Sequence, residues 1–324
     1  MKQRIIFFIT FLVFTKCQAQ NNSQNQGQIK TMKEQKIELE QIAKHEFSLL
    51  TDYKTKPMYY LQINKSACRV LVRVDDIPLG FHFVRDGGES MLYPINDCLM
   101  KSGKHTYSVD VYPMKGKPYI TKDAWVNIKP VYLSNKDDSL QKASIIGEEL
   151  SLPKNIEEQQ LAHYATSNTI EATLPFDYSS RLTGASDLRK ISNLEELVIK
   201  RYNAIREYMV KCDAVGFEKS RLHLYPNSDM VYLTEDNIIQ SASGDETFDP
   251  TILGREVLPI KDYEMVICGN GKLAMLLTKD EMDDILQVKY FETKEEQQAG
   301  AYTISTTATL LYLPKGSKQL EMFY

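Results

Sequence analysis

Alternation of apolar and polar positions is the clearest pattern in the chain, and it predicts antiparallel β-strands in the first half. Between Tyr59 and Leu133, several short alternating segments are separated by residues typical of turns. Cys68–Val74 alternates cysteine and valine with Arg69 and Arg73, and Thr106–Tyr112 repeats the pattern. A sheet that packs on one face and meets solvent on the other produces this period of two. We therefore predict an antiparallel β-sandwich.

The predicted sandwich domain covers residues 57–180. It includes a polar, charged excursion at 134–168, in which acid pairs and glutamines replace the alternating pattern. The strands are expected near Met58–Asn64, Cys68–Asp75, Leu79–Val84, Ser90–Ile95, Thr106–Tyr112, Ala124–Leu133 and Ile170–Pro175.

The second half begins with a helical pattern and continues with strands. Apolar residues recur at helical spacing from Leu194 to Cys212, and Ser192 with Glu195 forms a capping box before them. Asn270-Gly271 is typical of a type I′ hairpin turn. We predict an α+β domain over 187–324 with a curved antiparallel sheet. Its strands are expected at Arg221–Tyr225, Met230–Leu233, Tyr263–Cys268, Lys272–Thr278, Ile285–Glu292, Tyr302–Leu313 and Gln319–Phe323. The predicted fold is thus multidomain and β-rich.

The first 19 residues have the pattern of a secretory signal peptide. Lys2 and Arg4 precede the apolar run Ile5–Phe14, which is too short to span a bilayer, and small residues follow near Ala19. A lipoprotein signal with lipidation at Cys17 is the alternative, which the preceding lysine disfavours. We expect export to the periplasm or the extracellular space, and no transmembrane segment in the mature chain.

The segment after the signal is predicted to be a tether followed by a helix. Residues 20–30 are rich in Asn, Gln, Ser and Gly, a composition that cannot bury enough apolar surface to fold. An amphipathic helix is predicted over 31–56, on the spacing of Ile37, Ile42, Leu49 and Leu50.

Composition limits the classes of partner. The chain has 324 residues with 43% hydrophobic content, which is enough to form two cores. It carries 39 basic against 43 acidic residues, a formal net charge of −4 that becomes more negative when the basic signal is removed. Nucleic acids and anionic membrane surfaces require clustered positive charge, so we expect neither as a partner.

Four cysteines remain after the signal, and two interpretations of them stay open. In an oxidising compartment they can form two disulfides, with Cys68–Cys98 and Cys212–Cys268 as the pairs that respect the domains. Alternatively they are free, because most of them lie in apolar patterns where cysteine behaves as a small hydrophobic residue.

Each half resembles a known architecture. The phrases Val72–Asp76, Ile95–Leu99 and Lys101-Ser102-Gly103 resemble the jelly-roll of galactose-binding-like carbohydrate modules, which implies a sugar-binding accessory domain. An immunoglobulin-like structural sandwich is the alternative. The second half, with Leu194–Cys212 followed by Gly216-Phe217, is similar in architecture to the nuclear transport factor-like cone. That resemblance implies a pocket on the concave face of a sheet.

Two aromatic residues are the candidate ligand-binding residues. Trp125 is opposite the apolar face of its strand, and Tyr112 is opposite the apolar face of another. Exposed aromatics stack on sugar rings or anchor protein interfaces. The alternative is that a loop or the second domain covers both side chains.

The sequence predicts no catalytic residue, no metal ligand and no cofactor. The five histidines are scattered, without spacing typical of zinc sites, and no nucleophile elbow is present. Asp86–Glu89 and Asp280–Asp284 are acidic, but they lack the order of a calcium loop.

These observations favour a non-catalytic exported binding protein of the bacterial envelope, with an envelope protein or a glycan as partner. One alternative is a periplasmic hydrolase with a pocket in the C-terminal domain. The other is an immunity-type inhibitor of a toxin that acts in the periplasm.

Overall fold

The computed structural model describes residues 29–79, 86–221, 231–243, 246–279 and 281–323. The predicted signal peptide and most of the tether therefore lie outside the described residues. So do the predicted strands at Leu79–Val84 and Arg221–Tyr225, except for their first residues.

The chain is β-rich, with several antiparallel sheets and a few helices, as the sequence predicted. The helices are α1 (Met32–Ser48), α2 (Ser180–Thr183), α3 (Leu194–Val210), α4 (Ala214–Lys219), α5 (Glu235–Ser243) and α6 (Lys294–Ala299). The strands of the first half are β1 (Met58–Ser66), β2 (Arg69–Val74), β3 (Ile77–Pro78), β4 (Glu89–Pro94), β5 (Gly103–Tyr112), β6 (Trp125–Leu133), β7 (Ser144–Ile145), β8 (Leu150–Ser151) and β9 (Tyr164–Ala172). Those of the second half are β10 (Glu256–Val257), β11 (Tyr263–Cys268), β12 (Leu273–Thr278), β13 (Gln287–Tyr290), β14 (Thr303–Thr306), β15 (Leu311–Tyr312) and β16 (Glu321–Met322).

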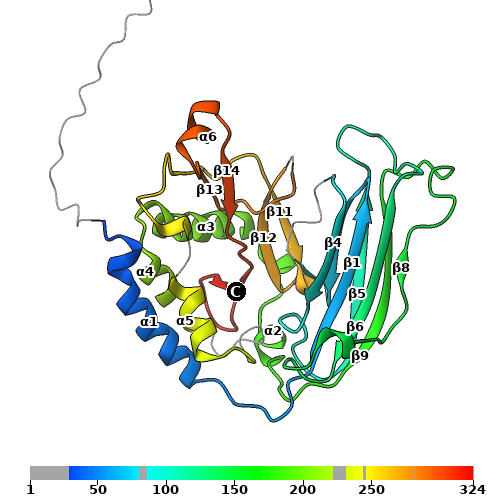
Figure 1. The fold of residues 1–324 in the computed structure, drawn as a ribbon, viewed down its shortest axis with the longest axis horizontal. Helices are drawn as coiled ribbons and strands as arrows, with labels where there is room; N and C mark the ends of the chain where they lie inside the picture. The colour runs from blue at the N-terminus through cyan, green and yellow to red at the C-terminus, as the bar shows by residue number, and fades with distance from the viewer. Residues whose placement is uncertain (1–28, 80–85, 222–230, 244–245, 280, 324) are drawn as a thin grey trace, which may run out of the picture.

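Two antiparallel sheets form the first half (Figure 1). The β1 sheet has the order β4-β1-β6-β7, with β8 also paired to β6, and the β2 sheet has the order β3-β2-β5-β9. Leu61 and Ile63 of the first sheet and Val70, Val72 and Val109 of the second are buried in one hydrophobic cluster. The alternating pattern of the sequence therefore corresponds to the facing inner surfaces of the two sheets.

The second half contains a four-stranded sheet, β11-β12-β15-β16, and a three-stranded sheet, β10-β13-β14. The predicted strand Tyr302–Leu313 is wrong as a single strand, because β14 pairs with β13 and β15 pairs with β12. Between them, the carbonyl oxygen of Thr309 accepts a hydrogen bond from the buried Tyr202 hydroxyl at 2.6 Å. A side chain of α3 thus replaces the neighbouring strand as a partner at this point.

The Asn270-Gly271 hairpin is confirmed. It joins β11 to β12, with Cys268 opposite Leu273. Asn270 and Gly271 both have positive φ angles, 56° and 85°, and the Lys272 amide donates to the Gly269 carbonyl at 3.2 Å. Positive φ at both central residues is the geometry of a type I′ turn.

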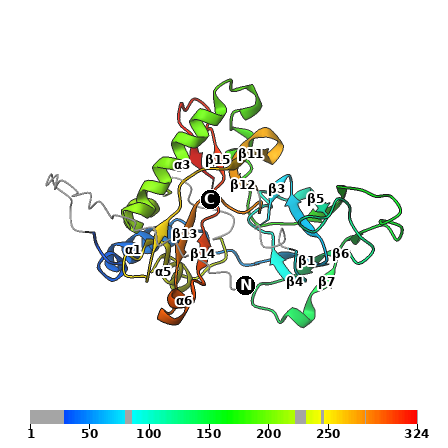
Figure 2. The same ribbon diagram turned by 90° about the horizontal axis from the view of Figure 1, so that it is seen from above.

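Helix α1 packs against α4 and α5, at the opposite end of the molecule from the two sheets of the first half (Figures 1 and 2). A capping box of Thr31 and Glu34 starts the helix. The buried Gln35 side chain donates to the Cys212 carbonyl oxygen at 2.6 Å and accepts from the Val215 amide at 3.1 Å. These bonds satisfy backbone groups where α3 ends and α4 begins.

Two details of the predicted N-terminal helix are wrong. The helix ends at Ser48 and does not continue toward residue 56. Its buried stripe is Gln35, Leu39, Ile42, Ala43 and Glu46, whereas Ile37 and Leu49, used in the prediction, are exposed.

Other segments differ from the predicted elements. Residues 231–233 form a turn before α5 where part of a strand was predicted, and the pattern missed α5 and α6. The polar excursion at 134–168 is partly ordered into strands, because β7 and β8 both pair with β6 and β9 begins at Tyr164. The short strands β7 and β8 extend the β1 sheet, whereas β9 pairs with β5 in the β2 sheet.

The four cysteines of the described residues are buried and none of them forms a disulfide, so both predicted disulfides are absent. Burial raises the pKa of the Cys68 thiol to about 11 and that of Cys268 to about 12. Buried neutral thiols of this kind are poor nucleophiles, and they behave as small hydrophobic residues.

Most of the buried hydrophobic residues, from both halves of the chain, form one continuous cluster. Aromatic side chains contribute where the halves meet: Tyr53 lies 6.1 Å from Phe176 and 6.4 Å from Tyr232 between ring centroids. The Lys136 ammonium also donates to the Tyr232 carbonyl oxygen. The division into two domains, with a boundary between 180 and 187, stays a prediction.

Candidate functional site

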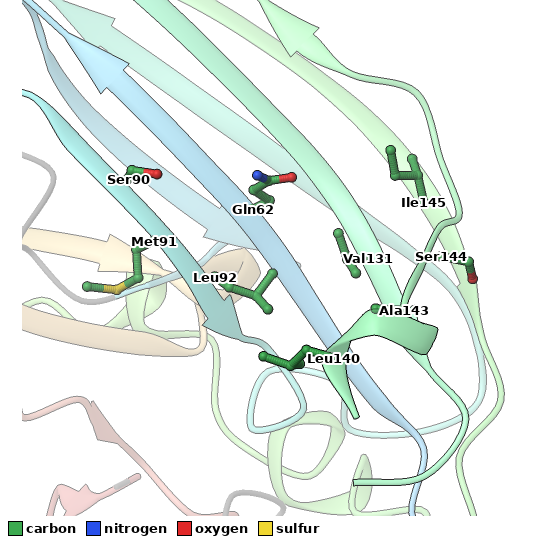
Figure 3. A pocket seen from close by; sticks show the side chains of 9 residues that line it. All are labelled: Gln62, Ser90, Met91, Leu92, Val131, Leu140, Ala143, Ser144 and Ile145. Carbon is green, nitrogen blue, oxygen red and sulfur yellow. The ribbon is translucent and has the colours of Figure 1, made fainter. Parts of the chain in front are cut away.

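A hollow of about 410 Å³ lies on the outer face of the β1 sheet (Figure 3). The outer face is the one turned away from the β2 sheet. Leu61 and Ile63 of β1 point inward and are buried, so Gln62 between them points outward. Strand β4 walls one side of the hollow, and the segment containing β7 walls the other. Its lining residues are Gln62, Ser90, Met91, Leu92, Val131, Leu140, Ala143, Ser144 and Ile145.

The hollow is open to solvent, and its lining combines exposed apolar side chains with the polar side chains of Gln62, Ser90 and Ser144. Leu140 and Ile145 keep 57% and 62% of their surface in contact with solvent, and Met91 is also exposed. Such exposed apolar side chains, when they gather around a concavity, are typical of surfaces that bind a partner or ligand. No lining residue is ionisable at neutral pH, so this hollow lacks a general acid, a general base and an activated nucleophile.

Trp125 lies on the same outer face as the hollow. Val126 and Ile128 of β6 are buried, so Trp125 and Asn127 point to the opposite side, and Trp125 is 53% exposed. Val131, in the hollow, lies six positions after Trp125 in β6, a distance of about 20 Å along the strand. The tryptophan and the hollow thus mark the two ends of one strip.

The strip between these ends is polar. Across β6 and β1, Asn127 is paired with Asn64 and Lys129 with Gln62. Asn64 Oδ1 accepts a hydrogen bond from Ser90 Oγ at 2.6 Å. The side-chain amides of Gln62 and Asn127 have no hydrogen-bond partner among the residues that the structure describes. We call Trp125, Asn127, Asn64, Gln62, Lys129 and the hollow the binding strip.

Tyr112, the second candidate residue, lies elsewhere. It is at the end of β5 and points outward from the β2 sheet, on the opposite side of the two-sheet stack from Trp125. Its ring is half-buried and stacks on His163, with 4.9 Å between ring centroids, and His163 Nε2 lies 2.8 Å from Asp110 Oδ1. Burial raises the pKa of Tyr112. One ligand site therefore cannot contain both aromatics.

A buried His–Asp pair lies outside the strip. His105 Nδ1 is 2.6 Å from Asp75 Oδ2, and His105 Nε2 is 2.8 Å from the Lys101 carbonyl oxygen. Because both neighbours are acceptors, this arrangement favours the form of the ring in which both nitrogens carry protons. Burial acts to lower the pKa of His105, but the hydrogen bond and charge of Asp75 outweigh it, so the pKa is raised above 6.5. Through these contacts, Asp75 links the turn after β2 to β5.

We expect Asp75→Asn to lower the pKa of His105, because only the Lys101 carbonyl and the charge of Glu171 then oppose the effect of burial. Asn tolerates the positive φ of residue 75, 49°, and its oxygen can still accept from the Thr106 amide. A raised histidine pKa stabilises the fold below pH 6.5, and that stabilisation is lost as pH rises through the raised pKa. The variant should lose about 2 kcal/mol of unfolding free energy at pH 6 and less at pH 9.

Proton NMR titration of His105 and urea unfolding at pH 6 and pH 9 measure the two effects. A His105 pKa unchanged by the substitution would show that Asp75 does not hold the charge on the ring.

A second buried titratable group is Asp284, opposite Leu277 at the edge of β12. Its carboxyl has no hydrogen-bond partner among the described residues. Burial, with a smaller contribution from the charge of Asp283, raises the pKa of Asp284 to about 7. The nearby Tyr202 hydroxyl is fully buried and engaged with backbone groups of Thr309 and Leu276.

The described part of the chain contains no group of three or more His, Cys, Asp or Glu side chains that could hold a metal ion. Nor is any helix within it long and apolar enough to cross a membrane.

Sequence reasoning selected Trp125 but missed the hollow. Leu140, Ala143 and Ile145 belong to the polar excursion, where the acidic pairs dominate the pattern. The signal was nevertheless present, because apolar residues within an otherwise charged segment indicate either a packing contact or an exposed patch.

No protein-family model matches the chain, and no curated protein or solved structure shows significant similarity to it.

Proposed function

We propose that this chain is a non-catalytic binding protein, exported to the bacterial envelope, and that the outer face of the β1 sheet holds its ligand. The observation that carries the proposal is the hollow, in which apolar side chains of β4 and of residues 140–145 are held open to solvent on a rigid sheet. These side chains add nothing to the stability of the fold while they are exposed, because apolar surface that remains in water contributes no hydrophobic stabilisation. A ligand that covers them would supply it.

The chemistry of the strip supports binding over catalysis. Its one charged side chain, Lys129, is paired with Glu149 at 3.1 Å between Nζ and Oε2. The hydroxyl of Ser90 donates to Asn64, and the strip itself contains no histidine that could activate this hydroxyl. Amides, a paired lysine and apolar side chains can orient a ligand, but they cannot transfer a proton at neutral pH.

The single tryptophan provides the test. In protein labelled with 5-fluorotryptophan, the ¹⁹F NMR spectrum has one tryptophan signal, from Trp125. We expect a saturable shift of this signal when envelope extract of the host bacterium is added. Leu140→Asp with Ile145→Asp should weaken the response at least tenfold, because a charge in an apolar site opposes ligand burial. Both residues are exposed, so the fold should tolerate the change.

Ile37→Asp is the matched control, since Ile37 is an equally exposed isoleucine on α1, far from the strip. Protease treatment of the extract destroys a protein ligand, and periodate treatment destroys a glycan ligand. The treatment that abolishes the shift therefore identifies the class of ligand. The absence of any saturable shift, an equal effect of the control, or turnover of an extract component by the purified chain would each contradict the proposal.

A further inference from the structure

We infer that the ligand of the binding strip is a neutral glycan, an inference that rests on the proposed function and makes it specific. The argument depends on three properties of the strip: an aromatic surface at one end, unpaired amides along its length, and the absence of unpaired charge.

The aromatic surface is Trp125. Its indole is 53% exposed and stands at the end of β6, opposite Ser66 of β1, a small neighbour that leaves room beside the ring. A flat apolar face with a polar rim suits the C–H face of a sugar ring, which is apolar over its centre and hydroxylated at its edge. An apolar peptide side chain would be expected to enter a concavity. The hollow lies about 20 Å from Trp125 along the strand, so the position of Trp125 suits a sugar better than a peptide side chain.

The amides provide hydrogen bonds of the kind that hydroxyl groups need. Next to Trp125 on the outer face, Asn127 of β6 is paired with Asn64 of β1. Gln62, two residues before Asn64 in β1, is the next outward-facing side chain toward the hollow. The amides of Gln62 and Asn127 are without partners in the described structure, and Asn64 keeps its NH₂ group after its oxygen accepts from Ser90. Each amide offers both donors and acceptors, as vicinal hydroxyls do.

The charges of the strip indicate a neutral ligand. Lys129 is paired with Glu149, and Lys142 at the rim is paired with Asp138 at 2.6 Å. An anionic glycan would need unpaired lysine or arginine along its path, whereas a neutral chain needs none. The hollow at the far end presents uncharged polar and apolar side chains, which suit a neutral sugar chain that carries acetyl or methyl substituents.

Affinity gel electrophoresis of the full chain tests the inference. The probes are β-glucan, xylan, galactan and acetylated glucomannan, with polygalacturonate as the anionic comparison. We expect at least one neutral polysaccharide to retard the protein and polygalacturonate to leave its mobility unchanged. Trp125→Ala should weaken binding at least tenfold, and Asn64→Ala with Asn127→Ala about as much. Tyr302→Ala is the matched control, because Tyr302 is also a 53% exposed aromatic but lies beside β14 in the second half.

Three results would overturn the inference: no retardation by any neutral polysaccharide, tighter binding of polygalacturonate, or full binding by Trp125→Ala. If these appear while a protease-sensitive extract component still shifts the ¹⁹F signal of Trp125, the strip binds a protein and the proposed function stands. If no component shifts that signal, both fail.

Discussion

Replacing Asp284 with asparagine should raise the free energy of unfolding at pH 8 by up to about 4 kcal/mol and leave it nearly unchanged at pH 4. The carboxyl is buried without a hydrogen-bond partner in the described structure, and its pKa rises to about 7 from the ordinary 3.8. The folded chain therefore holds a proton that the unfolded chain releases.

The sign follows from proton binding. Between pH 3.8 and about 7 the folded state binds the proton of Asp284 more tightly than the unfolded state does. Raising the pH through this range favours unfolding, and above it the full cost of a buried carboxylate is present. Asparagine has the same shape and no charge, so the variant escapes this loss.

Urea unfolding of both proteins from pH 4 to pH 8 measures the effect. Asp262→Asn is the control, because Asp262 is an exposed carboxylate just before β11 with a positive φ of 51°, which asparagine tolerates. Parallel pH profiles for Asp284→Asn and the original chain would show that Asp284 is not protonated in the fold.

Leu39→Ala should lower the free energy of unfolding by about 2 to 5 kcal/mol, because it leaves a cavity where α1 meets the core. Leu39 is fully buried and belongs to the main hydrophobic cluster. Because α1 packs on α4 and α5, the loss should appear in the second half of the chain, although Leu39 precedes the first strand.

Urea unfolding measures the loss of free energy, and hydrogen–deuterium exchange followed by mass spectrometry shows where in the chain it occurs. Ile37→Ala is the control, since Ile37 lies two residues away on the exposed side of the same helix and should change stability by less than about 0.5 kcal/mol. Faster exchange in β1 and β6, with α4 and α5 unaffected, would contradict the packing of α1.

Period-two patterns allowed the sandwich strands to be predicted well, because each strand has one buried face. The same pattern failed at Tyr302–Leu313, where alternation continues across the break between β14 and β15. Alternation reports which side of a strand is buried, but it carries no information about the partner strand. The contact of Tyr202 with Thr309 that marks this break joins residues 107 positions apart.

The predicted helix at Leu194–Cys212 is confirmed as α3, but α3 begins after Asn193 without a side-chain cap, so the predicted capping box of Ser192 and Glu195 is wrong. The predicted buried stripe of α1 failed for a reason related to that of the strand. Ile37 was placed in the stripe because it is apolar, whereas the buried stripe includes Gln35 and Glu46, which are polar. Gln35 is buried because its amide satisfies backbone groups near the end of α3. Only the tertiary structure reveals that these groups need a partner.

The candidate site was predictable in part. The parity of Trp125 with buried Val126 and Ile128 placed it on the outer face, and its exposure agrees with that placement. The apolar residues within 140–145 gave a signal for an exposed patch, but the position and shape of the hollow were not predictable, because β4, β1, β6 and residues 140–145 form it together. The distance of Tyr112 from this site follows from its position in the other sheet.

The docking of α1 also constrains the order in which the chain folds as it is synthesised. Gln35 leaves the ribosome early, yet the carbonyl group it binds belongs to a residue 177 positions later. The strands of both sheets in the first half are complete by Ala172, before α4 and α5 have been made. A nascent chain of that length contains every strand of the first half and the α1 helix, whose packing partners α4 and α5 do not yet exist.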